Sequence, residues 1–308
     1  MTGFVDTTDV QLEAFEENFK EHKTMSKDYW LVSTERLKDK LWFRDQEDFT
    51  AGMNLVAVEA TVTGVVILAF ILMSNHVHFV LAGDKSTTNS FISRLKTRYS
   101  QYFGKKYGIS GLLRNNAVDL RVVRIGDESF ERAVAYVQMN SVAANVCLHP
   151  SLYPWGTGDL FFSQSEPAGV KTGEMTAREC IRKIHSKVPL PANYVLDRRG
   201  FIHPSSYVPV KYVESVFRTP KRMNYFLQSS SKAKQLSEGP SFSDQLLVSA
   251  VHDLSVSLYR KSSFSELETG QQAEIVKQLK YRFSSDPNQL SRITGLSYEK
   301  VCGLLDNP

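Results

Sequence analysis

The chain has 308 residues, of which 42% are hydrophobic and 23% are charged. This composition is that of a globular protein with a substantial buried core, and it excludes a collagen, a disulfide scaffold and a wholly disordered chain. Lysine and arginine exceed aspartate and glutamate by only 37 to 33, and a net charge of +4 does not by itself indicate a nucleic-acid-binding protein. At about 150 residues per domain, the length predicts two domains, or one domain with a large appendage.

The cysteines and the N-terminus indicate the compartment. The three cysteines, at positions 147, 180 and 302, lie far apart and form neither a CxxC pair nor a zinc-binding spacing, which is typical of a reducing intracellular compartment. The first residues lack the basic segment and apolar run of a signal peptide. The most apolar stretch, residues 65–73, is less than half of the roughly 20 residues that span a bilayer as a helix. We therefore expect a soluble, cytoplasmic protein without a membrane segment.

The first half of the chain has the periodicity of alternating strands and helices. Apolar spacing predicts, in chain order, a polar helix at 9–24, a strand at 29–34, a helix at 49–60, strands at 65–73 and 77–81 joined by a tight turn, a helix at 86–106, a strand at 118–125, and a helix capped by Asp127 or Ser129 with Phe130, Val134 and Val137 on one side. This β-α-β-β-α-β order followed by a helix predicts an α+β fold with a ferredoxin-like antiparallel sheet.

The sequence changes in character after residue 150. Residues 151–169 contain Pro, Gly, Trp and Phe without a period and predict an ordered crossover, and 176–186 predict a helix. Residues 229–243 are rich in Ser and Lys and predict a linker, whereas the chain from Asp244 onward predicts a series of helices. We expect a first domain over 1–165, an accessory region over 166–228, a linker over 229–243 and a mainly helical region over 244–308.

Two histidines stand one residue apart at the start of a predicted strand. Residues i and i+2 of a strand point to the same face, so His76 and His78 can present two imidazoles side by side. Two neutral imidazoles suit a divalent metal ion that keeps open positions. The alternative is that each histidine is simply packed and hydrogen-bonded, which is the more common fate of an isolated His-x-His pair.

A tyrosine and an asparagine share one face of the helix that follows. Tyr136 and Asn140 are four residues apart, and a phenol beside a carboxamide could serve a covalent phosphoryl transfer assisted by a metal ion. The alternative is that Tyr136 only packs between the helix and the sheet. Tyr99, Tyr102 and Tyr107 have no carboxamide or carboxylate four residues later, so Tyr136 is the candidate nucleophile.

These segments resemble the single-tyrosine HUH transposases. Residues 69–81 (AFILMSNHVHFVL) resemble the family signature A-x-x-x-M-P-N-H-V-H-x-x-L, and residues 136–142 (YVQMNSV) resemble its nucleophile helix, Tyr-x-x-x-Asn-Pro-Val. Residues 153–155 are similar to its Tyr-Pro-Trp segment, and residues 42–45 stand where it has Leu-Phe-x-Asp. The resemblance covers about residues 27 to 157 and is nearest to the REP-associated tyrosine transposases. Ser74 and Ser141 stand where the family usually has proline.

The resemblance implies a fold, a reaction and a set of site residues. It implies that the first domain is an HUH nuclease domain in which His76, His78 and Asn140 bind Mg²⁺ or Mn²⁺. Tyr136 would form a 5′-phosphotyrosyl bond to single-stranded DNA, which the protein would cleave and rejoin near hairpins. The alternative is a domesticated DNA-binding protein that no longer cuts, and a replication initiator or relaxase is a third, less supported reading. The sequence leaves open whether the protein is a monomer or a homodimer and whether Tyr136 acts in cis or in trans.

A basic tract lies between residues 85 and 125. It contains nine cations against Asp119 alone, a net charge of +8 that leaves −4 for the rest of the chain, and it is interleaved with aromatic residues. Cations that follow phosphates and aromatic rings that stack on bases are typical of a single-strand or hairpin binder. We therefore expect DNA beside the metal site, on Arg94, Lys96, Arg98, Lys105, Lys106, Arg114, Arg121 and Arg124. The alternative is a solvated helix face with aromatic residues in the core.

The end of the chain gives a weaker DNA-binding pattern. Residues 287–304 predict two short helices with Gly295 at the bend, as in a helix-turn-helix, with Ser297, Tyr298 and Lys300 opening the recognition helix. A plain helical hairpin that closes a small bundle explains the same pattern nearly as well.

Overall fold

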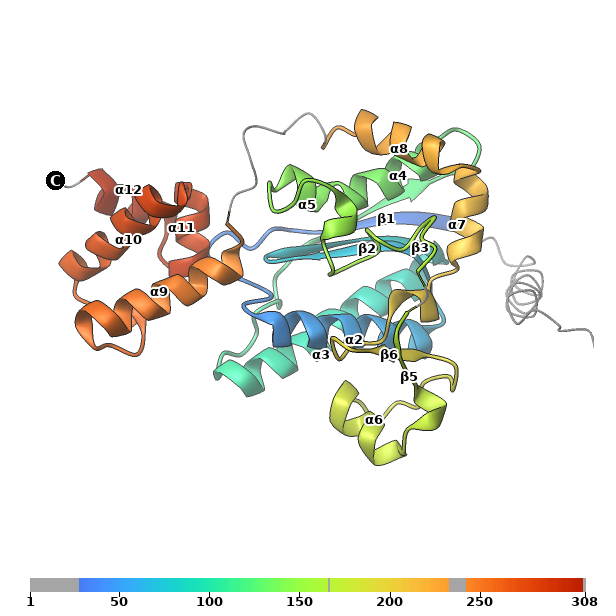
Figure 1. Cartoon of the computed structure of the whole chain (residues 1–308), viewed down its shortest axis with the longest axis horizontal. Coiled ribbons are helices and arrows are strands. Elements are labelled where there is room, and N and C mark those ends of the chain that lie inside the picture. The colour runs from blue at the N-terminus through green and yellow to red at the C-terminus, as the bar shows by residue number, and fades with distance from the viewer. Residues whose placement is uncertain (1–27, 166, 233–241, 307–308) are drawn as a thin grey trace, which may run out of the picture.

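A computed structural model describes residues 28–165, 167–232 and 242–306 (Figure 1). The protein is an α+β protein with a four-stranded antiparallel sheet, helices on both faces of that sheet, and a separate cluster of helices at its C-terminal end. None of the helices in these three segments is long and apolar enough to cross a membrane. The predicted helix at 9–24 lies outside the described residues.

The central sheet consists of strands β1 (Asp28–Thr34), β2 (Val66–Met73), β3 (His76–Gly83) and β4 (Val118–Val123). Its strand order is β2-β3-β1-β4, and every neighbouring pair is antiparallel. The four predicted strands are confirmed. β2 and β3 form a hairpin whose turn consists of Ser74 and Asn75, so that His76 opens β3 directly after the turn.

One face of the sheet is covered by α2 (Gln46–Thr63) and α3 (Lys85–Tyr107), which confirm two predicted helices. Asp45 caps α2 by accepting a hydrogen bond from the backbone N–H of Asp48, and Asp84 caps α3. Alternate residues of β3, Val77, Phe79 and Leu81, belong to the hydrophobic core that these helices form with the sheet. His76 and His78, which alternate with these residues along β3, therefore point to the opposite face.

The opposite face is covered by α4 (Ser129–Gln138), α5 (Asn140–Ala143), α7 (Val210–Phe217) and α8 (Pro220–Ser229). Phe130, Val134 and Val137 of α4 are fully buried, as the helical spacing predicts. The N-cap residue of α4 is Glu128, which has a left-handed backbone and no capping hydrogen bond, rather than the predicted Asp127 or Ser129. Asp127 still accepts a hydrogen bond from the backbone N–H of Ser129 at 3.0 Å, and the Ser129 hydroxyl donates to the carbonyl of Arg124.

The outer edge of β2 is covered by the segment that follows the 3₁₀ helix η2 (Pro150–Leu152). The backbone N–H of Leu72 donates to the carbonyl of Trp155 at 2.8 Å, and Gly156 pairs with Ile71. A Cβ atom on Gly156 would lie 2.4 Å from the carbonyl oxygen of Phe70, so only glycine allows this approach. The predicted crossover is therefore an ordered extension of the sheet edge.

Residues 167–206 form a small unit against α2. It contains a two-stranded antiparallel sheet and one α-helix, and Ile184, Leu196 and Ile202 form its core with Ala57 and Val58 of α2. Its elements are β5 (Gly169–Lys171), the 3₁₀ helix η3 (Thr172–Glu174), α6 (Ala177–Ile184), β6 (Val195–Asp197) and the 3₁₀ helix η4 (Pro204–Ser206). The helix predicted at 176–186 is confirmed as α6, which Thr176 caps.

The C-terminal helical cluster has its own hydrophobic core, in agreement with the helices predicted after Asp244. It consists of α9 (Asp244–Tyr259), the 3₁₀ helix η6 (Phe264–Glu266), α10 (Thr269–Phe283), α11 (Pro287–Thr294) and α12 (Tyr298–Asp306). Gly295 forms the predicted bend between α11 and α12 with φ at 74°. The cluster contacts the sheet domain through Asp244, which accepts a hydrogen bond from the Ser74 hydroxyl at 2.6 Å, and through Gln245, which donates to the carbonyl of Phe43 at 2.9 Å.

Candidate active site

The two histidines, the tyrosine and the asparagine selected from the sequence meet on the α4 face of the sheet. The ring centroids of His76 and His78 are 4.8 Å apart on β3, and the ring of Tyr136 lies edge-on to His78 with 5.4 Å between centroids. Asn140 begins α5, and only Met139 separates it from the end of α4 at Gln138. Strand alternation and one helical turn bring these four side chains together.

Hydrogen bonds fix the orientation of both imidazoles. Nδ1 of His76 donates to Oδ1 of Asn75 at 2.8 Å, and the amide of Asn75 is held by the carbonyl of Leu37. Nδ1 of His78 is 2.8 Å from the hydroxyl of Ser33 on β1. The Nε2 atoms of both rings are buried and have no hydrogen-bond partner. A histidine held through Nδ1 presents Nε2 as a ligand atom, and a buried polar atom without a partner is uncommon.

Asn140 is held by the last turn of the tyrosine helix. Its Nδ2 donates to the backbone carbonyl of Tyr136 at 2.7 Å, which leaves its amide oxygen for other partners. Burial lowers the pKa of His78 and the Asn140 side chain opposes that lowering, so the amide lies beside that imidazole. The same amide is therefore tied to the tyrosine helix and to the histidine pair.

Both histidines are neutral near physiological pH. Burial lowers the pKa of His76 well below its usual value, and the charges of His78, Arg36 and Lys232 lower it further. Burial likewise lowers the pKa of His78 to about 3, assisted by Lys232 and Arg36. A neutral imidazole is the form that ligates a metal ion.

The donor set suits a metal ion only in part. Two Nε2 atoms and one amide oxygen would supply three neutral ligands and leave positions open for substrate. Among residues 28–165, 167–232 and 242–306 there is no group of three or more His, Cys, Asp or Glu side chains that could hold a metal ion. The orphaned Nε2 atoms fit a metal site, but that site has no carboxylate ligand.

Lys232 is a site residue that the sequence did not indicate. Its Nζ atom lies 5.0 Å from the centroid of the Tyr136 ring, and the residue is only 9% exposed. The sequence predicts a linker over residues 229–243, which includes Lys232, because these residues are rich in Ser and Lys. Nothing in that composition shows that the chain returns over the tyrosine after α8.

No protein-family model, curated protein or solved structure matches the chain. The functional argument therefore rests on the geometry of these residues.

The expected position of the basic tract beside the metal site is wrong for α3. This helix lies on the other face of the sheet from Tyr136, and several of its cations are bound to carboxylates (Figure 1). Arg94 and Arg98 lie 2.6 and 3.6 Å from the buried carboxylate of Glu59. Lys106 contacts the carboxylates of Asp45, Glu47 and Asp48 at 2.9 Å each, and Lys96 donates to the carbonyl of Asn116.

The remaining cations of the tract are spread over the surface. Lys105, Arg114 and Arg124 are exposed and form no ion pair with a residue that the structure describes. Arg121 alternates with Leu120 on β4, so it lies on the same face of the sheet as His78, where it is 2.7 Å from the carboxylate of Asp119. Of the eight predicted DNA-binding residues, Arg121 is the one that the strand register places on the histidine face.

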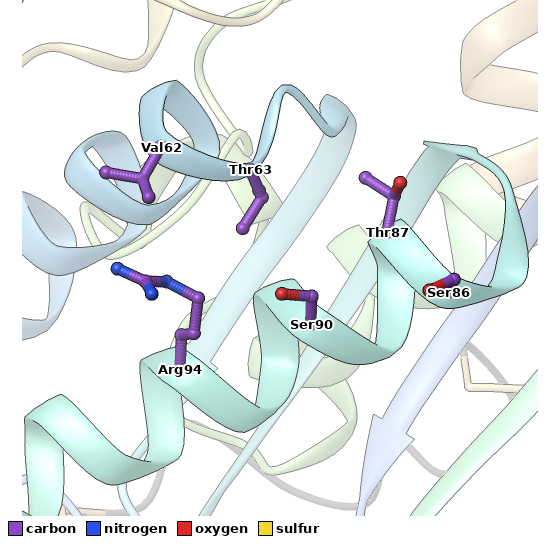
Figure 2. Close-up of a pocket in the computed structure, with 6 residues that line it drawn as sticks. All are labelled: Val62, Thr63, Ser86, Thr87, Ser90 and Arg94. Carbon is purple, nitrogen blue, oxygen red and sulfur yellow. The ribbon is translucent and has the colours of Figure 1, made fainter.

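A shallow depression lies on the far side of the sheet. It has a volume of about 340 Å³ and lies between the end of α2 and the start of α3, where Figure 2 shows Thr63, Thr87, Ser90 and Arg94 around it. Arg94 is already held by Glu59. The depression therefore shares no residue with the site around Tyr136.

Proposed function

We propose that the sheet and its flanking helices form a ferredoxin-like HUH nuclease domain. The strand order β2-β3-β1-β4, with α2 and α3 on one face, is the arrangement expected from the β-α-β-β-α-β sequence order. The tyrosine helix α4 packs on the opposite face, where the histidines of β3 also lie. This placement supports a nuclease site at the sheet rather than an unrelated use of the same strands.

We infer that the protein cleaves and rejoins single-stranded DNA, at or near hairpins, with Tyr136 as the nucleophile. The observation that carries this proposal is the position of the Tyr136 ring, 5.4 Å from a histidine pair whose buried Nε2 atoms have no partner. A purely structural tyrosine would not require two orphaned imidazole nitrogens beside it.

The residues would divide the reaction between them. Tyr136 would lose its phenolic proton as its oxygen bonds to phosphorus, while the bond from phosphorus to the 3′-oxygen breaks and that oxygen takes up a proton. His76 and His78, through Nε2, and Asn140, through its amide oxygen, would hold Mg²⁺ or Mn²⁺. Such an ion neutralises charge on the scissile phosphate and orients it. The phosphotyrosyl bond conserves the energy of the broken bond, so the 3′-hydroxyl can reverse the step.

Adduct formation tests this proposal. The full chain is incubated with Mn²⁺ and with single-stranded hairpins taken from the DNA that flanks its own gene, and covalent protein–DNA adducts are resolved under denaturing conditions. We expect an adduct with the wild type and with Tyr281→Phe, a control at a 79% exposed tyrosine, but none with Tyr136→Phe. An adduct with Tyr136→Phe would refute the nucleophile assignment.

A DNA-binding protein that does not cut is the second candidate. It is favoured by the burial of both Nε2 atoms and by the position of the Lys232 Nζ atom, 5.0 Å from the centroid of the Tyr136 ring. Hairpin binding by the wild type, with no adduct in Mg²⁺ or Mn²⁺, would support this candidate.

A further inference from the structure

We propose that Lys232 and Arg36 form a phosphate-binding pair beside Tyr136, and that they make metal binding at the histidine pair depend on a bound DNA phosphate. This inference rests on the proposed function, because it names the part of the site that holds the substrate. Neither residue belongs to the basic tract that the sequence indicated.

Lys232 is a largely buried cation without a counter-charge. It is 9% exposed, and it forms no ion pair with a carboxylate in the part of the chain that the structure describes. Its Nζ atom instead lies against the ring of Tyr136. Because a buried charge without a partner is costly, such a lysine is expected to be retained where an anion binds.

Arg36 approaches the same place from another segment. It follows β1, it is exposed, and it too has no ion pair with a described residue. Its neighbour Leu37 pairs with Asn75, because the Leu37 N–H donates to the carbonyl of Asn75 at 3.0 Å and the Asn75 side-chain amide donates to the carbonyl of Leu37 at 2.9 Å. Arg36 therefore lies next to the turn that precedes His76. Burial and, after it, the charge of Arg36 lower the pKa of Lys232. A third cation, Arg292 of α11, also acts on His76, but Asp244 binds it at 3.2 Å. Arg36 and Lys232 are therefore the two cations left to receive an anion.

The charge of the site couples the binding of the metal ion to the binding of DNA. The candidate metal ligands are two imidazoles and an amide, which carry no negative charge, and the unpaired charges beside them, on Lys232 and Arg36, are positive. A divalent cation entering alone would meet repulsion from Lys232 and Arg36 without a carboxylate to offset it. A phosphate from single-stranded DNA supplies the missing negative charge to both. The metal ion should therefore bind more tightly when DNA is present, and DNA should bind more tightly, by the same factor in affinity, when the metal ion is present.

Two binding measurements with opposite expected signs test the inference. They use the full chain carrying Tyr136→Phe, so that no cleavage is needed. Free Mn²⁺ is measured by electron paramagnetic resonance without DNA, and the affinity for a labelled single-stranded hairpin is measured without metal over a range of salt. Lys232→Gln and Arg36→Gln are compared with Lys187→Gln, which removes an exposed lysine of the small unit that packs against α2.

We expect Lys232→Gln and Arg36→Gln to tighten Mn²⁺ binding several-fold in the absence of DNA. They should also weaken hairpin binding and reduce the slope of log K against log salt by about one each. Lys232→Arg should keep both affinities near those of the parent, and Lys187→Gln should leave Mn²⁺ binding unchanged. Arg36 is exposed, so its variant separates the electrostatic effect from any loss of folding at Lys232.

Three other outcomes would overturn the inference. Loss of both affinities would show that the cations only maintain structure. Gain of both would show that Lys232 blocks the site, and no change in either would show that no phosphate contacts the pair. None of these results depends on adduct formation, so the cleavage proposal and this inference can fail separately.

Discussion

Three cations of α3 and Lys232 lie on opposite faces of the central sheet, and of these only the α3 cations are paired with carboxylates of the described residues. On the α3 face, Arg94, Arg98 and Lys106 contact carboxylates of α2 or its cap. On the α4 face, Lys232 lies against Tyr136 with no carboxylate among the described residues. The number of cations in a segment therefore does not locate a binding surface. What matters is whether the fold has already supplied each cation with an anion.

Buried carboxylates explain why the α3 face is neutralised. Glu59 and Asp48 are fully buried, and such groups require a cation or several hydrogen bonds to be tolerated. Asp48 accepts hydrogen bonds from Tyr102, Tyr107 and Lys106. The aromatic and basic residues of α3 thus stabilise the packing of α3 on α2, which is the alternative that the sequence left open.

The largest contrast between the faces should appear in adduct formation. His78→Ala removes a ligand atom of the α4 face, and we expect the rate of adduct formation to fall by more than about 100-fold, since changes to residues that only support metal ligands already cost 10- to 100-fold. Arg94→Ala on the α3 face should leave the rate within a few-fold of the wild type. Rates are measured by quenched time courses with Mn²⁺. A comparable loss in both variants would remove the functional distinction between the two faces.

A smaller contrast should appear in stability. Replacing both Arg94 and Arg98 by Met leaves the carboxylate of Glu59 buried without a cation, and we expect the free energy of unfolding to fall by about 2–4 kcal/mol. Adding Glu59→Met to the double variant should restore most of that loss, because the unpaired charge is removed. Urea denaturation followed by circular dichroism measures these differences. If the triple variant is no more stable than the double variant, the ion pair is not the cause.

The smallest effect concerns a property that both faces share. Burial raises the pKa of Tyr99 on the α3 face and of Tyr153 on the α4 face. A tyrosine in the unfolded chain loses its proton near pH 10, whereas these two tyrosines keep theirs in the folded protein. The free energy of unfolding therefore falls as the pH rises above 10, by about 1.4 kcal/mol per pH unit for each tyrosine. Tyr99→Phe and Tyr153→Phe should each flatten this decline in alkaline denaturation curves. A decline unchanged by both variants would contradict the burial argument.

The sequence predicted the elements of the sheet domain well because their signals are local. The alternation of residues 65–81 and the helical spacing of Phe130, Val134 and Val137 depend only on which face is buried. The same local rules brought His76 and His78, two residues apart, to one face. Tyr136 and Asn140 follow one helical turn, so these four residues could be selected without a structure.

The rest of the site depends on contacts between distant segments. Lys232 reaches Tyr136 across 96 positions of the chain, and its Ser- and Lys-rich surroundings resemble a linker. The role of the α3 cations depended on Glu59, 35 residues before Arg94. One signal was available there: Glu59 stands alone in an otherwise apolar helical run, and a single acid at such a position is expected to have a buried cationic partner.

The hydrogen bond between Ser74 and Asp244 bears on how the two halves of the chain can vary. The Ser74 hydroxyl donates to Asp244, and Asp244 also binds Gln289 and Arg292 of the C-terminal cluster. A chimera that exchanged the C-terminal cluster for another would leave Ser74 without its acceptor, two residues from His76. Positions 74 and 244 should therefore be inherited, recombined and engineered as a unit.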